Sequence, residues 1–213
     1  VVAMTPGQRA LYASLLERGR SLVAGRERRG TGRNAKPPSA AENKAAKSLF
    51  FDLRKAACHP CLMRSHYTAA DVEEMAKAAK AMEFFGANAT LSMIQKELAT
   101  NSDFQLHQLC LELPQVHRLA LPHHVLCESG KVARLVALLP RLREEGHKVL
   151  IFSQWTQMLD IMESILGAPP GLDLSFVRLD GSTAVEERQQ LIDSFQAKDS
   201  QIFAFLLSTR AGG

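Results

Sequence analysis

Three short segments rich in hydroxyl and glycine residues each follow an apolar run in the C-terminal part of the chain. They are Ser153-Gln154, Asp180-Gly181-Ser182-Thr183 and Ser208-Thr209-Arg210-Ala211-Gly212-Gly213. Hydroxyls and exposed backbone N–H groups suit phosphate oxygens, whether those of a nucleotide or of a nucleic-acid backbone. Each segment alone is more typical of a plain cap or turn. Three of them at one edge of a sheet would favour phosphate binding.

Other combinations of reactive residues are less informative. Ser129-Gly130-Lys131 is not a P-loop, because Val125 stands where that motif requires Gly and Val132 where it requires Ser or Thr. The chain has no G-x-G-x-x-G fingerprint. Asp180 is the only acid in the three segments, and no Ser-His-Asp arrangement is suggested by spacing. We therefore assign no catalytic residue in this chain.

Cys58-His59-Pro60-Cys61 combines a CxxC pair with a histidine. A structural zinc site usually needs a second pair of ligands. The dispersed candidates are His66, Cys110, His123, His124 and Cys127. Only His123 and His124 are close in sequence, and adjacent side chains seldom converge on one ion. The pattern favours structural cysteines over zinc, and we expect no metal site.

The positive charge of the chain is concentrated in one stretch. Its 213 residues hold 26 Lys+Arg and 22 Asp+Glu, for a net charge of +4. From Arg18 to Lys36 there are seven basic residues and one acid, so the remainder is slightly acidic. The run from Gly25 to Pro38 contains three glycines and two prolines, which predicts a solvated loop. Direct contact of this stretch with DNA or nucleosomes is the less favoured alternative.

The composition excludes several classes of protein. With 46% hydrophobic and 23% charged residues, the chain is typical of a globular protein. It has no apolar run of the ~18–20 residues that a membrane span needs, and no secretory signal pattern. Four cysteines are too few for a disulfide scaffold and indicate a reducing compartment. Because it starts at Val1 and stops in a glycine-rich turn, we expect a fragment of a longer protein.

Residues 129–213 show the pattern that would place the three segments together. A helical stripe over residues 132–142 precedes three apolar strands at Lys148–Phe152, Leu174–Leu179 and Ile202–Leu207. Helices are predicted between them, at Trp155–Leu166 and from a capping box at Thr183-Ala184-Val185-Glu186 through Phe195. Strands alternating with helices predict an α/β fold with a parallel sheet covered on both faces. An open sheet of three strands would also expose an apolar edge.

The rest of the chain is predicted to be mainly helical. Residues 1–63 begin a helix at Thr5-Pro6, and a second runs from about Ala41 to Ala57, where His59-Pro60 stops it. Residues 64–128 read as a helical connector. The expected helices there are Ala69–Ala81, with Thr68 as its cap and Asp71 in its first turn, Leu91–Ala99 and Phe104–Leu111. The sequence therefore predicts three parts of the chain: residues 1–63, 64–128 and 129–213.

Several segments, taken together, resemble motifs of the Swi/Snf-type ATPases, which are DNA translocases of helicase superfamily two. Lys148–Gln154, Arg178–Thr183 with Arg188, and Phe205–Gly213 resemble its motifs IV, IVa and V. Leu53–Leu62 and Ser129-Gly130-Lys131 resemble two further family segments. Within the family, the SMARCAD (Etl/Fun-type) branch is the most similar, through the passages Tyr67–Ala69, Asp103–Cys110 and Arg188–Phe195. The arginine-rich stretch at about 18–38 has no counterpart and looks like an insertion.

The resemblance implies a fold and a function. The chain would hold the end of the first lobe and a helical protrusion (1–63), a connector (64–128), and a truncated RecA-like helicase C-terminal lobe (129–213). The implied partners are double-stranded DNA and nucleosomes with their histones, in the nucleus and with no membrane. The residues implied to contact the DNA backbone are Ser153, Gln154, Gly181, Thr183, Ser208 and Thr209. Arg210, Ala211, Gly212 and Gly213 would begin the turn that couples DNA to the ATP cleft, and Asp180 and Arg188 belong to motif IVa.

Departures from the family pattern limit what this chain could do alone. The Walker A lysine, the acidic Mg²⁺-binding box and the arginine-finger motif are absent from it. ATP and Mg²⁺ are therefore expected as cofactors of an intact translocase, and this chain is expected to be inactive alone. The alternative is a non-catalytic α/β protein-interaction module with a helical arm.

Overall fold

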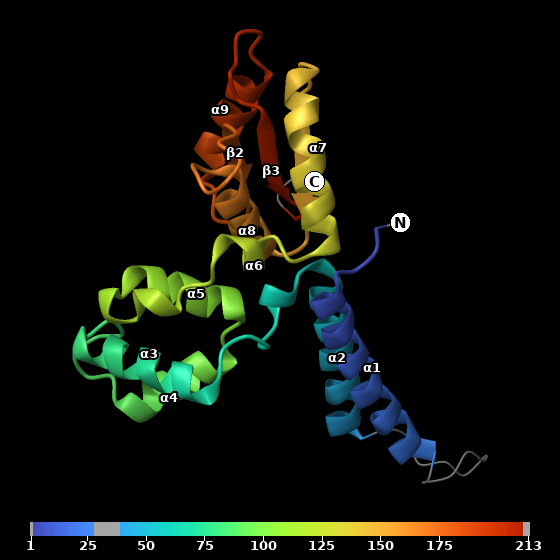
Figure 1. The fold of residues 1–213 in the computed structure, drawn as a ribbon, viewed down its shortest axis with the longest axis vertical. Coiled ribbons are helices and arrows are strands. Elements are labelled where there is room, and N and C mark those ends of the chain that lie inside the picture. Colours follow the sequence, from blue (N-terminus) through green and yellow to red (C-terminus); the bar gives the residue numbers. More distant parts are fainter. Residues whose placement is uncertain (1, 28–38, 211–213) are drawn as a thin grey trace. The chain divides into compact units, whose positions relative to one another are not determined.

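The computed structural model describes residues 2–27 and 39–210 (Figure 1). The chain divides into two compact units, which are described separately. Unit 1 is Val1–Ala120 with Glu128–Gly130, and unit 2 is Leu121–Cys127 with Lys131–Gly213. Among the helices of the described residues, none is both long and apolar enough to cross a membrane.

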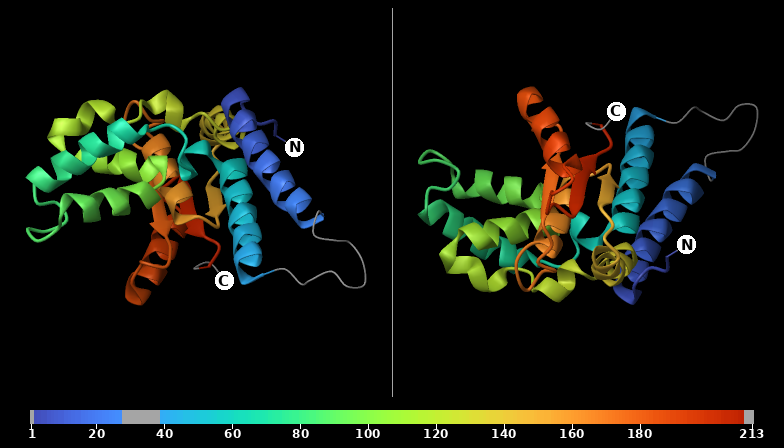
Figure 2. Two further views of the ribbon diagram at one scale, coloured as in Figure 1. Left: turned by 90° about the horizontal axis from the view of Figure 1, so that it is seen from below. Right: turned by 90° about the horizontal axis from the view of Figure 1, so that it is seen from above.

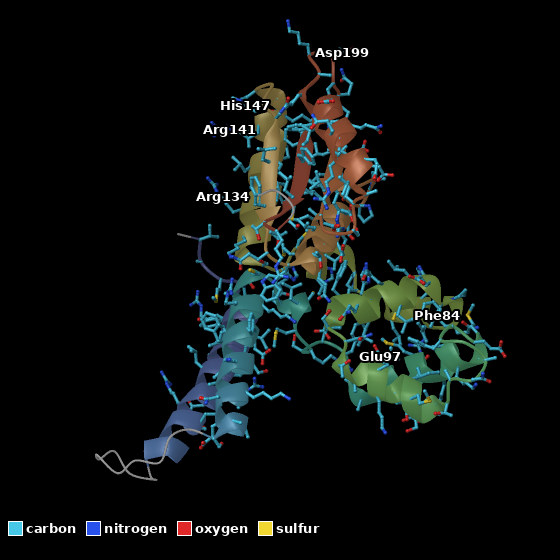
Figure 3. All side chains as sticks on the ribbon, turned by 180° about the vertical axis from the view of Figure 1, so that it is seen from behind. Phe84, Glu97, Arg134, Arg141, His147 and Asp199 are labelled. Atoms are coloured by element: carbon cyan, nitrogen blue, oxygen red, sulfur yellow. The ribbon has the colours of Figure 1, made fainter. Side chains whose placement is uncertain are left out.

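Unit 1 begins with a pair of long helices, α1 (Pro6–Glu27) and α2 (Ala40–Cys58), which lie side by side (Figures 1 and 2). Thr5 caps α1, where its hydroxyl accepts the Gln8 N–H at 3.2 Å. Ser39 caps α2 in a capping box with Glu42. The 3-10 segment η1 (Pro60–Leu62) follows directly after His59. The predicted start of α1 and both ends of α2 agree with the structure to within about one residue.

The solvated loop predicted from Gly25 begins later than expected. Helix α1 continues to Glu27, so Arg18, Arg20 and Arg26 are helical residues. In the middle of α1, packing against α2 at Gly19 offsets the weak helix propensity of glycine. The two helices are so close that a Cβ built on Gly19 would lie 2.8 Å from a Leu49 methyl group. The Arg18 guanidinium also pairs with Asp52 of α2 at 2.6 Å. Residues 28–38, the remainder of the predicted loop, lie outside the described residues.

The second part of unit 1 is a compact group of shorter helices. They are α3 (Ala69–Ala81), α4 (Leu91–Thr100), α5 (Asp103–Glu112) and the 3-10 segment η2 (Pro114–Leu119). Thr68 caps α3 in a capping box with Asp71, as the sequence predicts. Large apolar side chains fill the core between these helices: Met75, Ile94, Leu98, Phe104, Leu106 and Leu113 are at most 2% exposed.

Unit 2 is an α/β unit built on a parallel sheet, which confirms the predicted fold class. Its strands β1 (Val149–Ser153), β2 (Phe176–Leu179) and β3 (Ala204–Ser208) lie in the order β1-β3-β2. Its helices are α6 (His123–Leu126), α7 (Gly130–Glu144, whose first residue belongs to unit 1), α8 (Thr156–Leu166) and α9 (Val185–Gln196). Strand β3 is buried along its whole length because it lies between the other two.

Helices α8 and α9 cover opposite faces of the sheet. Phe195 of α9 packs with Leu179 and Phe205. Arg178, whose side chain points to the other face by the alternation of a strand, bonds to acids of α8. The predicted cover is incomplete on β1, where Leu150 and Phe152 on the α9 face are 53% and 56% exposed. Helix α9 packs against β2, and its cover does not extend to β1 in the described residues.

The capping box predicted at Thr183 is wrong. Helix α9 begins at Val185 with Ala184 as its N-cap, and no side chain caps it. The Thr183 hydroxyl accepts the Asp180 N–H at 3.0 Å instead, because it belongs to the preceding turn. Glu186 and Glu187 in the first turn still complement the helix dipole.

Candidate nucleic-acid interface

The structure brings the three predicted segments to one edge of the unit 2 sheet. Ser153 of β1 is paired in register with Ser208 of β3, and Leu179 of β2 with Leu207. The Thr209 N–H donates to the Ser153 carbonyl at 2.9 Å, so the loops after β1 and β3 are joined directly. The carboxyl edge of a parallel sheet is where ligands bind in α/β folds.

In the loop after β1, the Ser153 hydroxyl is used within its own turn. It donates to the Trp155 carbonyl at 2.9 Å and accepts the Trp155 N–H at 3.0 Å. The single hydroxyl hydrogen is therefore committed. Gln154 lies between them and is exposed. Ser153 thus shapes this loop, and the exposed backbone around Gln154 is what the loop presents.

The loop after β2 is organised by the buried Asp180 carboxylate. Its Oδ1 accepts the Ser182 N–H at 2.8 Å and the Ser182 hydroxyl at 2.6 Å. The Thr183 N–H donates to the Asp180 carbonyl at 3.2 Å. The Arg188 Nε donates to the Thr183 carbonyl at 3.2 Å, which ties the loop to α9. Asp180 is 3% exposed, so it acts inside the loop rather than on a ligand.

Arg178 at the end of β2 connects this loop to α8. Its Nε donates to Asp180 Oδ2 at 2.8 Å. Its Nη1 donates to Asp160 Oδ1 at 2.5 Å and to Glu163 Oε2 at 2.8 Å. One guanidinium thus meets three carboxylates with its side chain 21% exposed. Three carboxylates and one guanidinium leave this cluster with a net negative charge.

Hydrogen bonds explain the charge states of this cluster. The Ser182 hydroxyl, followed by the Ser182 N–H and Arg178, lowers the pKa of Asp180 below its ordinary value. The pKa of Arg178 is raised: burial opposes its charge, but its bonds to Asp160 and Asp180 outweigh that effect. Both groups are charged at neutral pH, as the geometry of an ion pair requires.

Three polar groups at this edge keep unused donors. Within the described residues, no hydrogen bond uses the Thr183 hydroxyl hydrogen, the Gly181 N–H or the Thr209 hydroxyl. Gly181, Thr209 and Arg210 are exposed, and Ser208 is buried. Ala211, Gly212 and Gly213 lie outside the described residues. The arrangement offers neutral donors and one exposed cation, which suits a phosphate backbone better than an acid–base reaction.

The cysteine and histidine cluster of unit 1 has a structural geometry. His59 is buried, and its Nδ1 accepts the Cys61 N–H at 3.1 Å, which caps the turn at Pro60. Burial raises the pKa of Cys61 to about 12, so its thiol is protonated at neutral pH. Among the described residues, no group of three or more His, Cys, Asp or Glu is placed to hold an ion.

Ser129 and Gly130 form a clamp in unit 1. The Ser129 hydroxyl donates to the Cys58 carbonyl at 2.8 Å, and the Gly130 N–H donates to Gln8 Oε1 at 3.1 Å. The buried Gln8 also donates to the Ala56 carbonyl at 2.9 Å. A Cβ built on Gly130 would lie 1.9 Å from the Ala3 carbonyl oxygen. The glycine is therefore needed for close backbone approach, and this segment binds protein backbone rather than phosphate.

Comparisons with known proteins agree with this geometry. Residues 130–213 match the family described as helicase conserved C-terminal domain. The chain is 43% identical over 169 residues to ATP-dependent helicase fft2 of Schizosaccharomyces pombe, covering 79% of this chain and 13% of that protein. It is 43% identical over 171 residues to a Drosophila melanogaster protein, the SWI/SNF-related matrix-associated actin-dependent regulator of chromatin subfamily A containing DEAD/H box 1 homolog, covering 80% of this chain and 19% of that protein.

Solved structures add a match over almost the whole chain. The crystal structure of the C-terminal part of the Fun30 ATPase domain is 33% identical, with a TM-score of 0.79, and the match covers 99% of this chain and 67% of that one. The chain belongs to the Swi/Snf-type ATPases, in the Fun30/SMARCAD branch. The Sulfolobus solfataricus SWI2/SNF2 ATPase core in complex with dsDNA, 18% identical with a TM-score of 0.56, shares the fold over 97% of this chain and 29% of its own.

This Swi/Snf-type chain places residues at the candidate site that its sequence motifs do not predict. The resemblance includes Arg178 only within motif IVa, and its partners Asp160 and Glu163 lie outside the motifs. One signal was available in the sequence. A parallel strand buried on both faces should be continuously apolar, so a charged residue within it requires a buried partner. Asp160 and Glu163, the two acids of the otherwise uncharged α8, meet that requirement.

Proposed function

We propose that this chain is part of an ATP-dependent double-stranded DNA translocase that remodels nucleosomes in the nucleus. The Swi/Snf-type relatives that it matches are much longer: the chain spans 13% of fft2 and 19% of the Drosophila relative. Unit 2 would contact the DNA backbone and help to close the ATP cleft. The observation that carries the proposal is the set of three strand-end loops at one sheet edge, whose donors at Gly181, Thr183 and Thr209 have no partner among the described residues.

The predicted contact residues would have different roles, depending on whether their donor already bonds to the protein. Thr183, Thr209 and the Gly181 N–H would donate to phosphate oxygens, with Arg210 adding one positive charge. Ser153 would act by shaping its turn, because its hydrogen is committed to Trp155. Neutral contacts of this kind follow the spacing of phosphates without reading bases, as a translocase requires. A core of the same fold has been solved in complex with dsDNA, which is consistent with this assignment.

ATP and Mg²⁺ belong to the proposal only for an intact translocase. The sequence holds neither a Walker A lysine nor an acidic Mg²⁺-binding box. We therefore expect the purified chain neither to bind ATP tightly nor to hydrolyse it. A clear DNA-stimulated ATPase rate from the chain alone would overturn this part.

Fluorescence anisotropy with a short labelled duplex tests the DNA contact. We expect salt-dependent binding of the wild-type chain, and about tenfold weaker binding after the double change Thr183→Val and Thr209→Val, because each loses a hydrogen bond to phosphate and Thr183→Val also loses the bond from the Asp180 N–H. Thr100→Val in α4 is the matched control, since it removes an exposed hydroxyl that bonds only within its own helix. Absence of duplex binding by the wild type would overturn the proposal in favour of the protein-interaction module.

A further inference from the structure

Arg178 joins the 180–183 loop to α8 through a side chain on the α8 face of the sheet. Its guanidinium holds Asp180 Oδ2 with Nε and Nη2, at 2.8 Å and 2.6 Å. The same group holds Asp160 and Glu163 with Nη1. The planar fork of arginine can bind several carboxylates in fixed directions at once. The loop and α8 are thus joined through a single side chain.

The Asp180 carboxylate connects Arg178 to the rest of the 180–183 loop through hydrogen bonds. Its two oxygens have separate tasks: Oδ2 meets Arg178, and Oδ1 accepts both the N–H and the hydroxyl of Ser182. The Asp180 N–H in turn donates to the Thr183 hydroxyl oxygen. This bond orients the Thr183 hydroxyl and leaves its hydrogen without an acceptor in the described residues. Removing the hold on Asp180 would therefore loosen the Thr183 donor.

Charge gives Arg178 a second effect. Asp160, Glu163 and Asp180 lie around it and would be close to one another without it. Three uncompensated carboxylates beside a loop that meets phosphate would repel the ligand. Arg178 compensates part of that charge while its own donors point at protein carboxylates.

We propose that Arg178 is a positioning residue for DNA: it fixes the 180–183 loop through Asp180 and against α8, without contacting phosphate itself. This inference rests on the proposed function, because it assumes that the loop meets the DNA backbone. It extends that function by placing the control of loop geometry on Asp160 and Glu163 of α8.

The decisive variant is Arg178→Lys, which keeps the positive charge but loses the fork. We expect about fivefold or more weaker duplex binding, because one ammonium cannot hold Asp180 and both α8 acids together. Arg143→Lys is the matched control: Arg143 donates to the Asp173 carbonyl on the surface of unit 2, so its replacement should leave affinity within about twofold. Wild-type affinity in Arg178→Lys would overturn the proposal.

Two further variants separate positioning from direct contact. Arg178→Gln with Asp160→Asn removes one positive and one negative charge together, so the net charge of the cluster does not change. This double variant should bind more weakly than the wild type, yet with the same salt dependence. A drop of about one in the slope of log affinity against log salt would show a lost phosphate contact and overturn the proposal. Asp160→Asn with Glu163→Gln leaves the Arg178–Asp180 pair in place. Loss of these two acids would strengthen binding through charge alone, so the weaker binding that we expect would show lost positioning, and unchanged or tighter binding would show that α8 has no part.

Amide hydrogen exchange without DNA tests whether Arg178 orders the 180–183 loop through Asp180, independently of the proposed function. In Arg178→Lys, the Ser182 and Thr183 amides should exchange faster than in the wild type, while amides of β3 stay unchanged. Unchanged exchange at these two amides would show that Arg178 does not order the loop through Asp180. A wild-type chain that fails to bind duplex would overturn the proposed function instead, and the exchange result would still decide whether Arg178 orders the loop. Far-ultraviolet circular dichroism of each variant confirms that it is folded.

Discussion

Unit 1 and unit 2 both place polar groups where helices and strands end, but they use them differently. In unit 1, the buried Gln8, His59 and Asp103 all bind backbone of their own unit. In unit 2, the loops at the sheet edge satisfy only part of their polar groups internally: no described residue accepts from the Gly181 N–H or from the Thr183 and Thr209 hydroxyls. A hydrogen bond within the fold gives a polar group a structural role, whereas a donor without a protein partner remains available to water or to a ligand.

The first way to test this difference is to remove the most heavily used acceptor of unit 1. Asp103 is 1% exposed and accepts the N–H groups of Ser65, His66 and Tyr67 at 2.8, 2.7 and 3.3 Å. Asp103→Ala leaves these donors unpaired and should lower the free energy of unfolding by about 4 kcal/mol. Urea unfolding measures it. Asp71→Ala, which removes an exposed cap, should cost only about 1 kcal/mol. Equal losses would show that Asp103 is not such a hub.

A second test compares two glycines, one in each unit. Gly130→Ala would force a Cβ to within 1.9 Å of the Ala3 carbonyl oxygen. The free energy of unfolding should therefore fall by about 3 kcal/mol. Gly181→Ala meets no atom within 4 Å and should change stability by less than about 0.5 kcal/mol. Thermal and urea unfolding of both variants provides the measurement. A destabilised Gly181→Ala would mean that the unit 2 loop is as closed as the unit 1 clamp.

A third test uses pH to measure how much the Asp180 carboxylate stabilises the 180–183 loop of unit 2. The folded pKa of Asp180 is lowered by Ser182 and Arg178, so its contribution to stability is present above the ordinary value of about 3.9 and lost as the pH falls below it. Between about pH 6 and pH 3, the stability advantage of the wild type over Asp180→Asn should shrink by about 1 kcal/mol. Urea midpoints at each pH test this. A constant difference would mean that the carboxylate charge does not stabilise the loop.

The smallest expected effect concerns two turns with left-handed backbone. Glu83 (φ 52°) follows α3, where the Phe84 N–H donates to the Ala79 carbonyl and the Glu83 N–H to the Lys80 carbonyl. This is the position of a helix end at which glycine is preferred. Glu83→Gly should therefore raise stability by about 0.5–1 kcal/mol. Asp173→Gly in unit 2 (φ 51°) should gain less, because aspartate tolerates this region better.

Local sequence signals predicted most helices and strands to within one or two residues. Thr5-Pro6, Thr68 with Asp71, and His59-Pro60 act through bonds and steric limits within a few residues, so they can be read from the sequence. The extent of α1 could not be read in this way. Its middle turns pack against α2, where Gly19 lies close to Leu49 and Arg18 pairs with Asp52, and such contacts between distant segments cannot be read from the local glycine and charge pattern that predicted a loop.

The amino-acid sequence by itself determined the α/β class, the parallel sheet and the family, because periodicity and motifs are written along the chain. Only the tertiary structure decided which hydroxyl hydrogens are used, since that depends on neighbours in space. It assigned Ser153 to its own turn and Thr183 to the turn before α9. It also gathered Asp160, Glu163 and Asp180 around Arg178, which no spacing along the sequence specifies.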